Sequence, residues 1–131
     1  MAGYDQTPIE PVSNSGVALV TTAETTVLSI SNVNTGGAEG TVMIMGSVYV
    51  AAGAGTTDIY VKVYRGATTA GPIIGTILDQ TVAAGSSHVI PFDIVDNPGE
   101  VAGQEYIVTV TQIGATGNGD VHLVTASGFT N

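Results

Sequence analysis

Short apolar runs rich in β-branched residues, each closed by a turn-forming segment, restrict the fold of this chain more than any other feature. The intervening segments, such as NTGGAEG and DNPGEVAG, carry the Gly, Asn, Asp and Pro residues that turns require. No helical period is long enough to compete with this pattern. The chain is therefore predicted to be all-β, with strands over residues 17–22, 25–31, 41–52, 57–65, 74–80, 86–94, 104–113 and 120–128.

Alternation within these runs predicts how the strands are layered. In DIYVKVYRG, the side chains of Ile59, Val61 and Val63 share one face, and the same alternation recurs in YIVTVTQ. One apolar face for each strand predicts two antiparallel sheets packed face to face. Irregular loop lengths favour a Greek-key arrangement over an up-and-down barrel. We therefore expect a single eight-stranded antiparallel jelly-roll sandwich over residues 17–131.

The strongest short hairpin signal in the chain is Asn118–Gly119. An Asn-Gly pair suits the two central positions of a type I′ turn. This signal predicts that residues 104–113 and 120–128 form neighbouring antiparallel strands.

Residues 1–16, MAGYDQTPIEPVSNSG, are predicted to form an extended amino-terminal arm. Pro8 and Pro11 fix φ and remove backbone donors, which disfavours a sheet ladder. A disordered terminus is the alternative interpretation. If the arm binds a partner, its spaced apolar side chains are the expected contacts: Tyr4, Ile9 and Val12.

The run TVMIMGSVYV, residues 41–50, is apolar on both faces of its predicted strand. One row, Val42, Ile44, Val48 and Val50, is expected to form the sandwich core. The other row is large and apolar as well, and its burial is favourable by about 1.5 to 3 kcal/mol for each side chain. Its cover could be loops of the same chain, the arm, or further copies. We favour a homotrimer that buries Met43, Met45 and Tyr49.

Charge excludes two classes of partner. Eleven carboxylates stand against two cations, Lys62 and Arg65, which gives a net charge of -9. Nucleic acids and anionic membranes are attracted by clustered cations, so neither is expected as a partner. Each of the two cations could pair with a carboxylate of a neighbouring chain, although a solvated position is the simpler interpretation for Lys62.

No targeting segment is apparent in the sequence. The first residues lack a basic region followed by an apolar one, and no apolar run reaches about 18 residues. We therefore expect synthesis in the cytoplasm without a membrane span. The chain has no cysteine, so disulfides and thiolate metal sites are excluded.

Enzymatic activity is not expected from the sequence. Ser86 or Ser87 could combine with His88 or His122 and an Asp, but no G-x-S-x-G elbow surrounds either serine. Two histidines also provide too few ligands for a zinc site. Surface positions on strands are the preferred interpretation for both histidines, and no cofactor is expected.

Four oxygen-bearing residues in FDIVDNPGE form the best candidate for a metal site. Calcium accepts carboxylate and amide oxygens in such loops, although the EF-hand spacing is absent. Turn formation by the Asn-Pro-Gly-Glu sequence is the preferred explanation for these residues. The calcium candidate comprises Asp93, Asp96, Asn97 and Glu100.

Four stretches between residue 61 and residue 121 match a known family of proteins: YRG at 64–66, IPFDIVDNPG at 90–99, AGQEYIVTV at 102–110 and GATGNGDV at 114–121. With these stretches the segment resembles small jelly-roll proteins of tailed bacteriophages. These proteins include capsid decoration (cement) proteins, which are similar to the trimeric tumour-necrosis-factor-like jelly roll. The similarity covers about half of the chain and rests on framework and turn residues.

This resemblance implies a structural virion protein that is not an enzyme. The expected protein is a homotrimer that is made in the host cytoplasm and binds the major capsid protein on the outer surface of a phage head. There it would stabilise neighbouring capsomers through multivalent attachment. The alternative is a tail-fibre or receptor-binding sandwich that attaches to a host-surface glycan, for which Tyr60 and Tyr64 would supply aromatic surface.

Overall fold

A computed structural model describes residues 6–80, 82–83 and 85–131 of the chain. The described part contains eight β-strands and no helix. The strands are β1 (Thr7–Leu19), β2 (Thr25–Val33), β3 (Val42–Ala51), β4 (Asp58–Arg65), β5 (Ile73–Asp79), β6 (Ser87–Asp96), β7 (Gln104–Ile113) and β8 (Gly119–Thr130).

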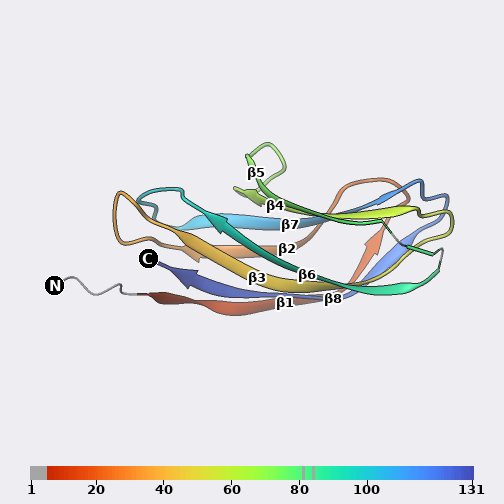
Figure 1. The fold of residues 1–131 in the computed structure, drawn as a ribbon, viewed down its shortest axis with the longest axis horizontal. Helices are drawn as coiled ribbons and strands as arrows, with labels where there is room; N and C mark the ends of the chain where they lie inside the picture. Colours follow the sequence, from red (N-terminus) through yellow and green to blue (C-terminus); the bar gives the residue numbers. More distant parts are fainter. Residues whose placement is uncertain (1–5, 81, 84) are drawn as a thin grey trace.

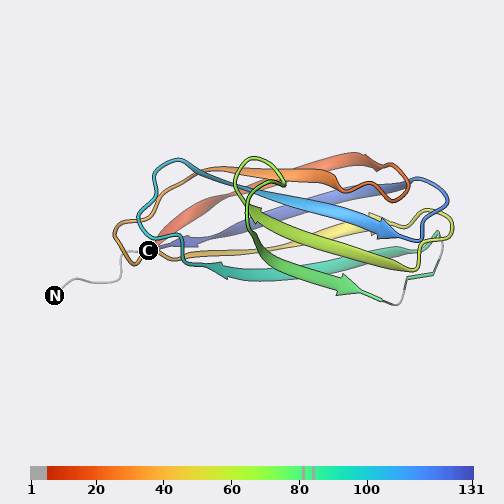
Figure 2. The same ribbon diagram turned by 90° about the horizontal axis from the view of Figure 1, so that it is seen from above.

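The strands form two antiparallel sheets that pack face to face, as Figures 1 and 2 show. One sheet has the order β1-β8-β3-β6, and the other has the order β2-β7-β4-β5. Among the described strands, β4 and β5 are the only pair that is adjacent both in sequence and in a sheet. Most connections therefore cross between the sheets. This order is that of a jelly roll, so the predicted fold class is confirmed.

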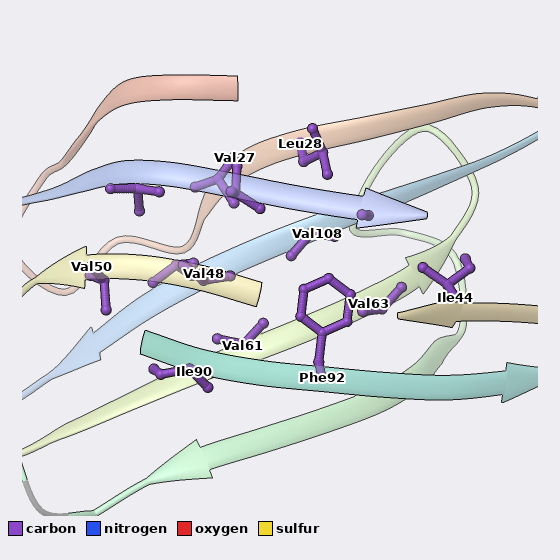
Figure 3. Close-up of a cluster of buried hydrophobic side chains, with 14 of the residues drawn as sticks. Val27, Leu28, Ile44, Val48, Val50, Val61, Val63, Ile90, Phe92 and Val108 are labelled. Atoms are coloured by element: carbon purple, nitrogen blue, oxygen red, sulfur yellow. The ribbon is translucent and has the colours of Figure 1, made fainter. Parts of the chain in front are cut away.

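The core lies between the two sheets and consists mainly of β-branched side chains (Figure 3). The inward rows predicted from alternation are confirmed on β3 and β4, where these side chains are almost fully buried: Val42, Ile44, Val48, Val50, Ile59, Val61 and Val63. Phe92 of β6 fills the centre of the layer beside Val63 in Figure 3. The core covers the inner face of each sheet, and the outer faces of the two sheets lie outside it.

The predicted arm is wrong from residue 7 onward, because this segment is the first strand of the sandwich. β1 pairs with β8 from Thr7 opposite Thr130 to Leu19 opposite Gly119. Both prolines are tolerated because β1 lies at the edge of its sheet, and the pairing register shifts between Ile9 and Val12. The boundary expected between residues 16 and 17 therefore does not exist. Tyr4 lies outside the described residues.

The hairpin predicted at Asn118–Gly119 is also wrong. β7 pairs with β2 and β4, whereas β8 pairs with β1 and β3 in the other sheet. The intervening turn thus carries the chain across the sandwich. Gln112, near the end of β7, is bound to the connection between β3 and β4, because its buried amide oxygen accepts hydrogen bonds from the Gly53 amide at 2.6 Å and the Thr56 hydroxyl at 3.1 Å.

Candidate functional site

The outer face of the β1-β8-β3-β6 sheet carries two rows of exposed apolar side chains. In the first row, Val95 of β6 and Phe129 of β8 lie opposite Met43 of β3. In the second row, the corresponding partners of Tyr49 are Val89 and Leu123. We call this surface the apolar face, and we define it by these six residues together with Met45.

Exposed apolar side chains are concentrated on this face. Seven of the ten large apolar residues that are exposed in the described chain belong to it, and the other three, Val20, Ile73 and Ile113, are scattered elsewhere. Val89 and Val95 are the most exposed members, at 64% and 53%. Single exposed apolar residues are ordinary, but a contiguous patch usually marks an association surface.

The centre of the apolar face is hollowed. Met45 stands between the two apolar rows with Asp93 on one side and Ser127 on the other. An open depression of about 710 Å³ surrounds it, and its lining includes Pro11 and Pro91. The face therefore offers an apolar rim and a partly polar floor to a partner.

Prolines interrupt both edge strands of this sheet. Pro91 lies in the middle of β6, while Pro8 and Pro11 lie in β1. A proline has no amide proton to donate, so a further strand cannot form a continuous ladder along either edge. Association of this sheet with another molecule is therefore favoured through its face.

The sequence prediction found three members of this face and missed four. Met43, Met45 and Tyr49 lie on the outer surface, with 36 to 41% of each side chain exposed. The missed residues are Val89, Val95, Leu123 and Phe129. For β6 the signal was present in HVIPFDIVD, where alternate residues around the buried Ile90, Phe92 and Ile94 point outward.

The predicted capsid contacts within the described chain lie elsewhere. Ile9 and Val12 are half-buried and pack against the hydrophobic core from β1. The reason is that the pleat of an edge strand turns one row of side chains inward. The placement of these two side chains therefore does not support their use as anchors on a capsid.

The residues of the calcium candidate do not converge. Asp93 points outward on the apolar face, whereas Asp96 is 5% exposed and faces the interior. Asn97 accepts a hydrogen bond from the Thr41 hydroxyl at 3.1 Å, and Glu100 is exposed in the following loop. No group of three or more His, Asp or Glu side chains that could hold a metal ion occurs among the described residues.

Asp96 is instead held by a buried polar network that joins the two sheets. The Arg65 guanidinium donates to both of its carboxylate oxygens, at 2.7 Å and 2.5 Å, and the Tyr106 hydroxyl donates at 2.7 Å. Arg65 and Tyr106 belong to one sheet and Asp96 to the other. The interpretation of Arg65 as a partner for a neighbouring chain is thus replaced by an ion pair within the chain.

These hydrogen bonds decide the charge state of the network. Burial alone would raise the pKa of Asp96, but the bonds from Arg65 and Tyr106 outweigh burial and lower its pKa below 3.8. Burial and the same carboxylate raise the pKa of Tyr106 above its ordinary value of 10.0. At neutral pH the network therefore consists of a carboxylate, a guanidinium and a neutral phenol.

Tyr64 is not available as an aromatic binding surface. It is 4% exposed, and its hydroxyl donates to Glu24 Oε2 at 2.7 Å. The Thr109 hydroxyl donates to the same oxygen at 2.7 Å. Burial and Glu24 raise the pKa of Tyr64 to about 12. Tyr60 is half-buried and has the Lys62 ammonium 5.8 Å from its ring centre, so little free aromatic surface remains on this sheet for a glycan.

We expect Tyr64→Phe to lower the free energy of unfolding by about 1 kcal/mol at neutral pH, because a buried hydrogen bond is lost. Since the folded-state pKa of Tyr64 lies above 10.0, its stabilising contribution is complete below pH 10 and is lost as the pH rises through about 12. Thermal unfolding followed by circular dichroism from pH 8 to 12 should show the difference closing. Tyr60→Phe is the control, and an equal effect in both variants would contradict the assignment.

The two histidines lie at strand positions, as expected, but both are paired. His122 Nδ1 is 2.9 Å from Asp120 Oδ2, and its ring lies 5.0 Å from that of Tyr49. His88 Nδ1 is 3.0 Å from Asp79 Oδ2, and its Nε2 is 2.7 Å from Ser86 Oγ. The structure thus brings together a Ser, a His and an Asp whose proximity the sequence could not show.

No family model matches the chain, and no curated protein matches it in sequence. The described residues contain no helix that is long and apolar enough to cross a membrane.

Solved structures with a similar fold include particles of a virus. The T=1 particles derived from infectious bursal disease virus give a TM-score of 0.64 at 10% identity, over 95% of this chain and 32% of that one. The VP2 subviral particle of the same virus gives 0.61 at 10% identity, over 95% and 33%. Latent PorU from Porphyromonas gingivalis gives 0.54 at 9% identity, over 95% and 13%.

The chain spans about a third of the length of the viral chains that it matches. At such low identity the likeness establishes the fold alone. The chain therefore has a jelly-roll sandwich of the kind found in viral capsid proteins.

Proposed function

We propose that this chain is a structural virion protein, a homotrimeric decoration protein that binds the outer surface of a phage head and stabilises neighbouring capsomers. The observation that carries the proposal is the apolar face, where seven large side chains are exposed on one sheet of the sandwich. The composition of the chain supports association with other protein subunits, because only 10% of the residues are charged and few charges need to be desolvated on association.

The geometry supports closed association over open growth. The prolines in both edge strands disfavour the addition of a further strand, which would lead to filaments. Association through the apolar face is favoured instead. A closed ring of three copies buries the same patch on every subunit and leaves no free patch behind. Such a trimer could contact the major capsid protein at three places at once, and these individually weak contacts would together give tight binding.

Association is tested by size-exclusion chromatography with light scattering. The wild-type chain is expected at about three times its mass of 13.1 kDa. Met45→Asp should give monomers, because it places a charge in the centre of the buried patch. Ile73→Asp is the matched control: this side chain is also exposed, at 50%, but lies on β5 of the other sheet, and the variant should remain trimeric.

The trimer proposal fails if the Met45→Asp and wild-type proteins elute at the same mass, whatever that mass is. Circular dichroism of each variant shows whether the fold is retained. Attachment to a shell is a separate measurement, in which capsids stripped of the protein are incubated with it. Saturable rebinding that raises the melting temperature of the shell supports decoration, whereas binding to host cells alone supports the receptor-binding alternative.

A further inference from the structure

The connection between β5 and β6 aligns a serine, a histidine and an aspartate by hydrogen bonds. Ser86 Oγ lies 2.7 Å from His88 Nε2, and His88 Nδ1 lies 3.0 Å from Asp79 Oδ2. Asp79 ends β5 in one sheet and His88 lies near the start of β6 in the other, and both are edge strands, so the line of contacts joins the two sheets at one edge of the sandwich. None of these residues belongs to the apolar face.

The order of the contacts assigns a role to each group. Asp79 accepts the hydrogen bond of Nδ1, which places the lone pair of a neutral imidazole on Nε2, the atom facing Ser86 Oγ. An imidazole oriented by a carboxylate and aimed at a hydroxyl is the arrangement that general-base activation of a serine requires. About a fifth of the His88 and Asp79 side chains is exposed, so the pair is partly shielded from water and still accessible.

Ser86 itself stands at the end of a tight turn and is half-buried. Its amide donates to the Ala83 carbonyl at 3.0 Å, and Gly85 has a φ of +73°, in the left-handed region. A Cβ added to Gly85 would meet no atom within 4 Å apart from its chain neighbours, so the turn is uncrowded at this position. The Ser86 hydroxyl donates to the Ala83 carbonyl oxygen at 2.5 Å, so its proton has to turn from that oxygen toward His88 Nε2 before the imidazole can take it.

We propose that Ser86 is an acylatable hydroxyl, activated by His88 and Asp79, which accepts an acyl group from an activated ester. In this step Oγ forms a bond to the acyl carbon, and the bond between that carbon and the leaving oxygen breaks. The Ser86 proton passes to His88 Nε2 and from there to the leaving group. The products are an ester on Ser86 and a free alcohol or phenol.

The experiment uses the whole chain and p-nitrophenyl acetate. Release of p-nitrophenol is followed together with peptide mass spectrometry, which distinguishes an acetyl group on Ser86 from one on Lys62. His88→Asn and Asp79→Asn should slow acetylation of Ser86 at least tenfold, since general-base catalysis contributes about 10²- to 10⁴-fold. Acetylation of Lys62 should be unchanged and provides an internal reference in every sample.

Ser87→Ala is the matched control, because Ser87 is the next residue and its exposed side chain points to the side of β6 opposite His88. This variant should keep the wild-type rate at Ser86, whereas Ser86→Ala should lose the adduct. The proposal is overturned if no adduct forms at Ser86, or if the rate there is the same in His88→Asn. Either outcome would mean that the three residues only hold the two sheets together. Melting curves of all variants show whether each is folded.

Discussion

Replacing Asp96 by alanine is expected to lower the free energy of unfolding by about 3 kcal/mol, the lower end of the cost of breaking a buried ion pair. The lower end applies because the Arg65 side chain is 32% exposed and can regain water. The Tyr106 hydroxyl cannot, because this residue is fully buried, and it would lose its acceptor. Chemical denaturation followed by circular dichroism measures the loss.

Glu100→Ala is the matched control for this experiment. Glu100 follows β6 in the next loop and is exposed, so its replacement should change stability by no more than about 0.5 kcal/mol. Similar losses in the two variants would show that the Asp96 network contributes nothing specific.

The contribution of Asp96 also has a defined pH dependence. Its folded-state pKa lies below 3.8, so the stabilisation is present above that pH and is lost as the pH falls through the folded-state value. The difference in stability between the wild type and Asp96→Ala should therefore be constant near neutrality and close in strong acid. A difference that widens on acidification would contradict the assigned charge state.

Gly128→Ala is the second change with a large expected effect. Gly128 lies opposite Ile44 where β8 pairs with β3, and a Cβ there would overlap the carbonyl oxygen of Met43. Backbone in the middle of a sheet cannot move aside as a flexible side chain can. We expect a loss of about 3 kcal/mol or more, at the upper end of the range for overpacking.

Gly37→Ala is the matched control, because a Cβ at Gly37 would meet no atom within 4 Å. Its stability should stay within about 0.5 kcal/mol of the wild type. Thermal unfolding of the two variants side by side separates the effect of the close approach from the general effect of removing a glycine. Equal melting temperatures would contradict the tight β3–β8 packing.

The sandwich was predictable because its inner faces follow a period of two. Ile59, Val61 and Val63 alternate with polar neighbours, and this pattern alone places them on the core side of a strand. The same logic identified the two-sided apolar strand β3. Periodicity thus established both the all-β class and the layer that each of these residues enters.

Strand partners were less predictable, because pairing depends on contacts that are distant in sequence. Pro8 and Pro11 argued against a strand, yet an edge position tolerates both, and the edge position of β1 is set by β8 more than a hundred residues later. Asn118–Gly119 suits a hairpin locally, but the chain crosses between sheets there instead. Local turn chemistry does not reveal which sheet receives the next strand.

The polar sites show the same limit. Asp96 lies in a segment typical of an exposed turn, and nothing local indicates that Arg65 and Tyr106 meet its carboxylate. Likewise, Ser86 and His88 are close in sequence, but their alignment with Asp79 depends on how the edges of the two sheets approach each other. The Asp96 network and the set of Ser86, His88 and Asp79 come together only in the folded chain.

The placement of the two cations has a practical consequence for proteolysis. Trypsin cleaves after lysine and arginine, and both of its sites in this chain, Lys62 and Arg65, lie on β4. β4 is an inner strand that is paired with β5 on one side and β7 on the other, so a protease cannot reach it without opening the sheet. Where reclosing is faster than cleavage, the rate of tryptic digestion reports the population of the open state. One gel-based assay can therefore rank the stability of every variant described above.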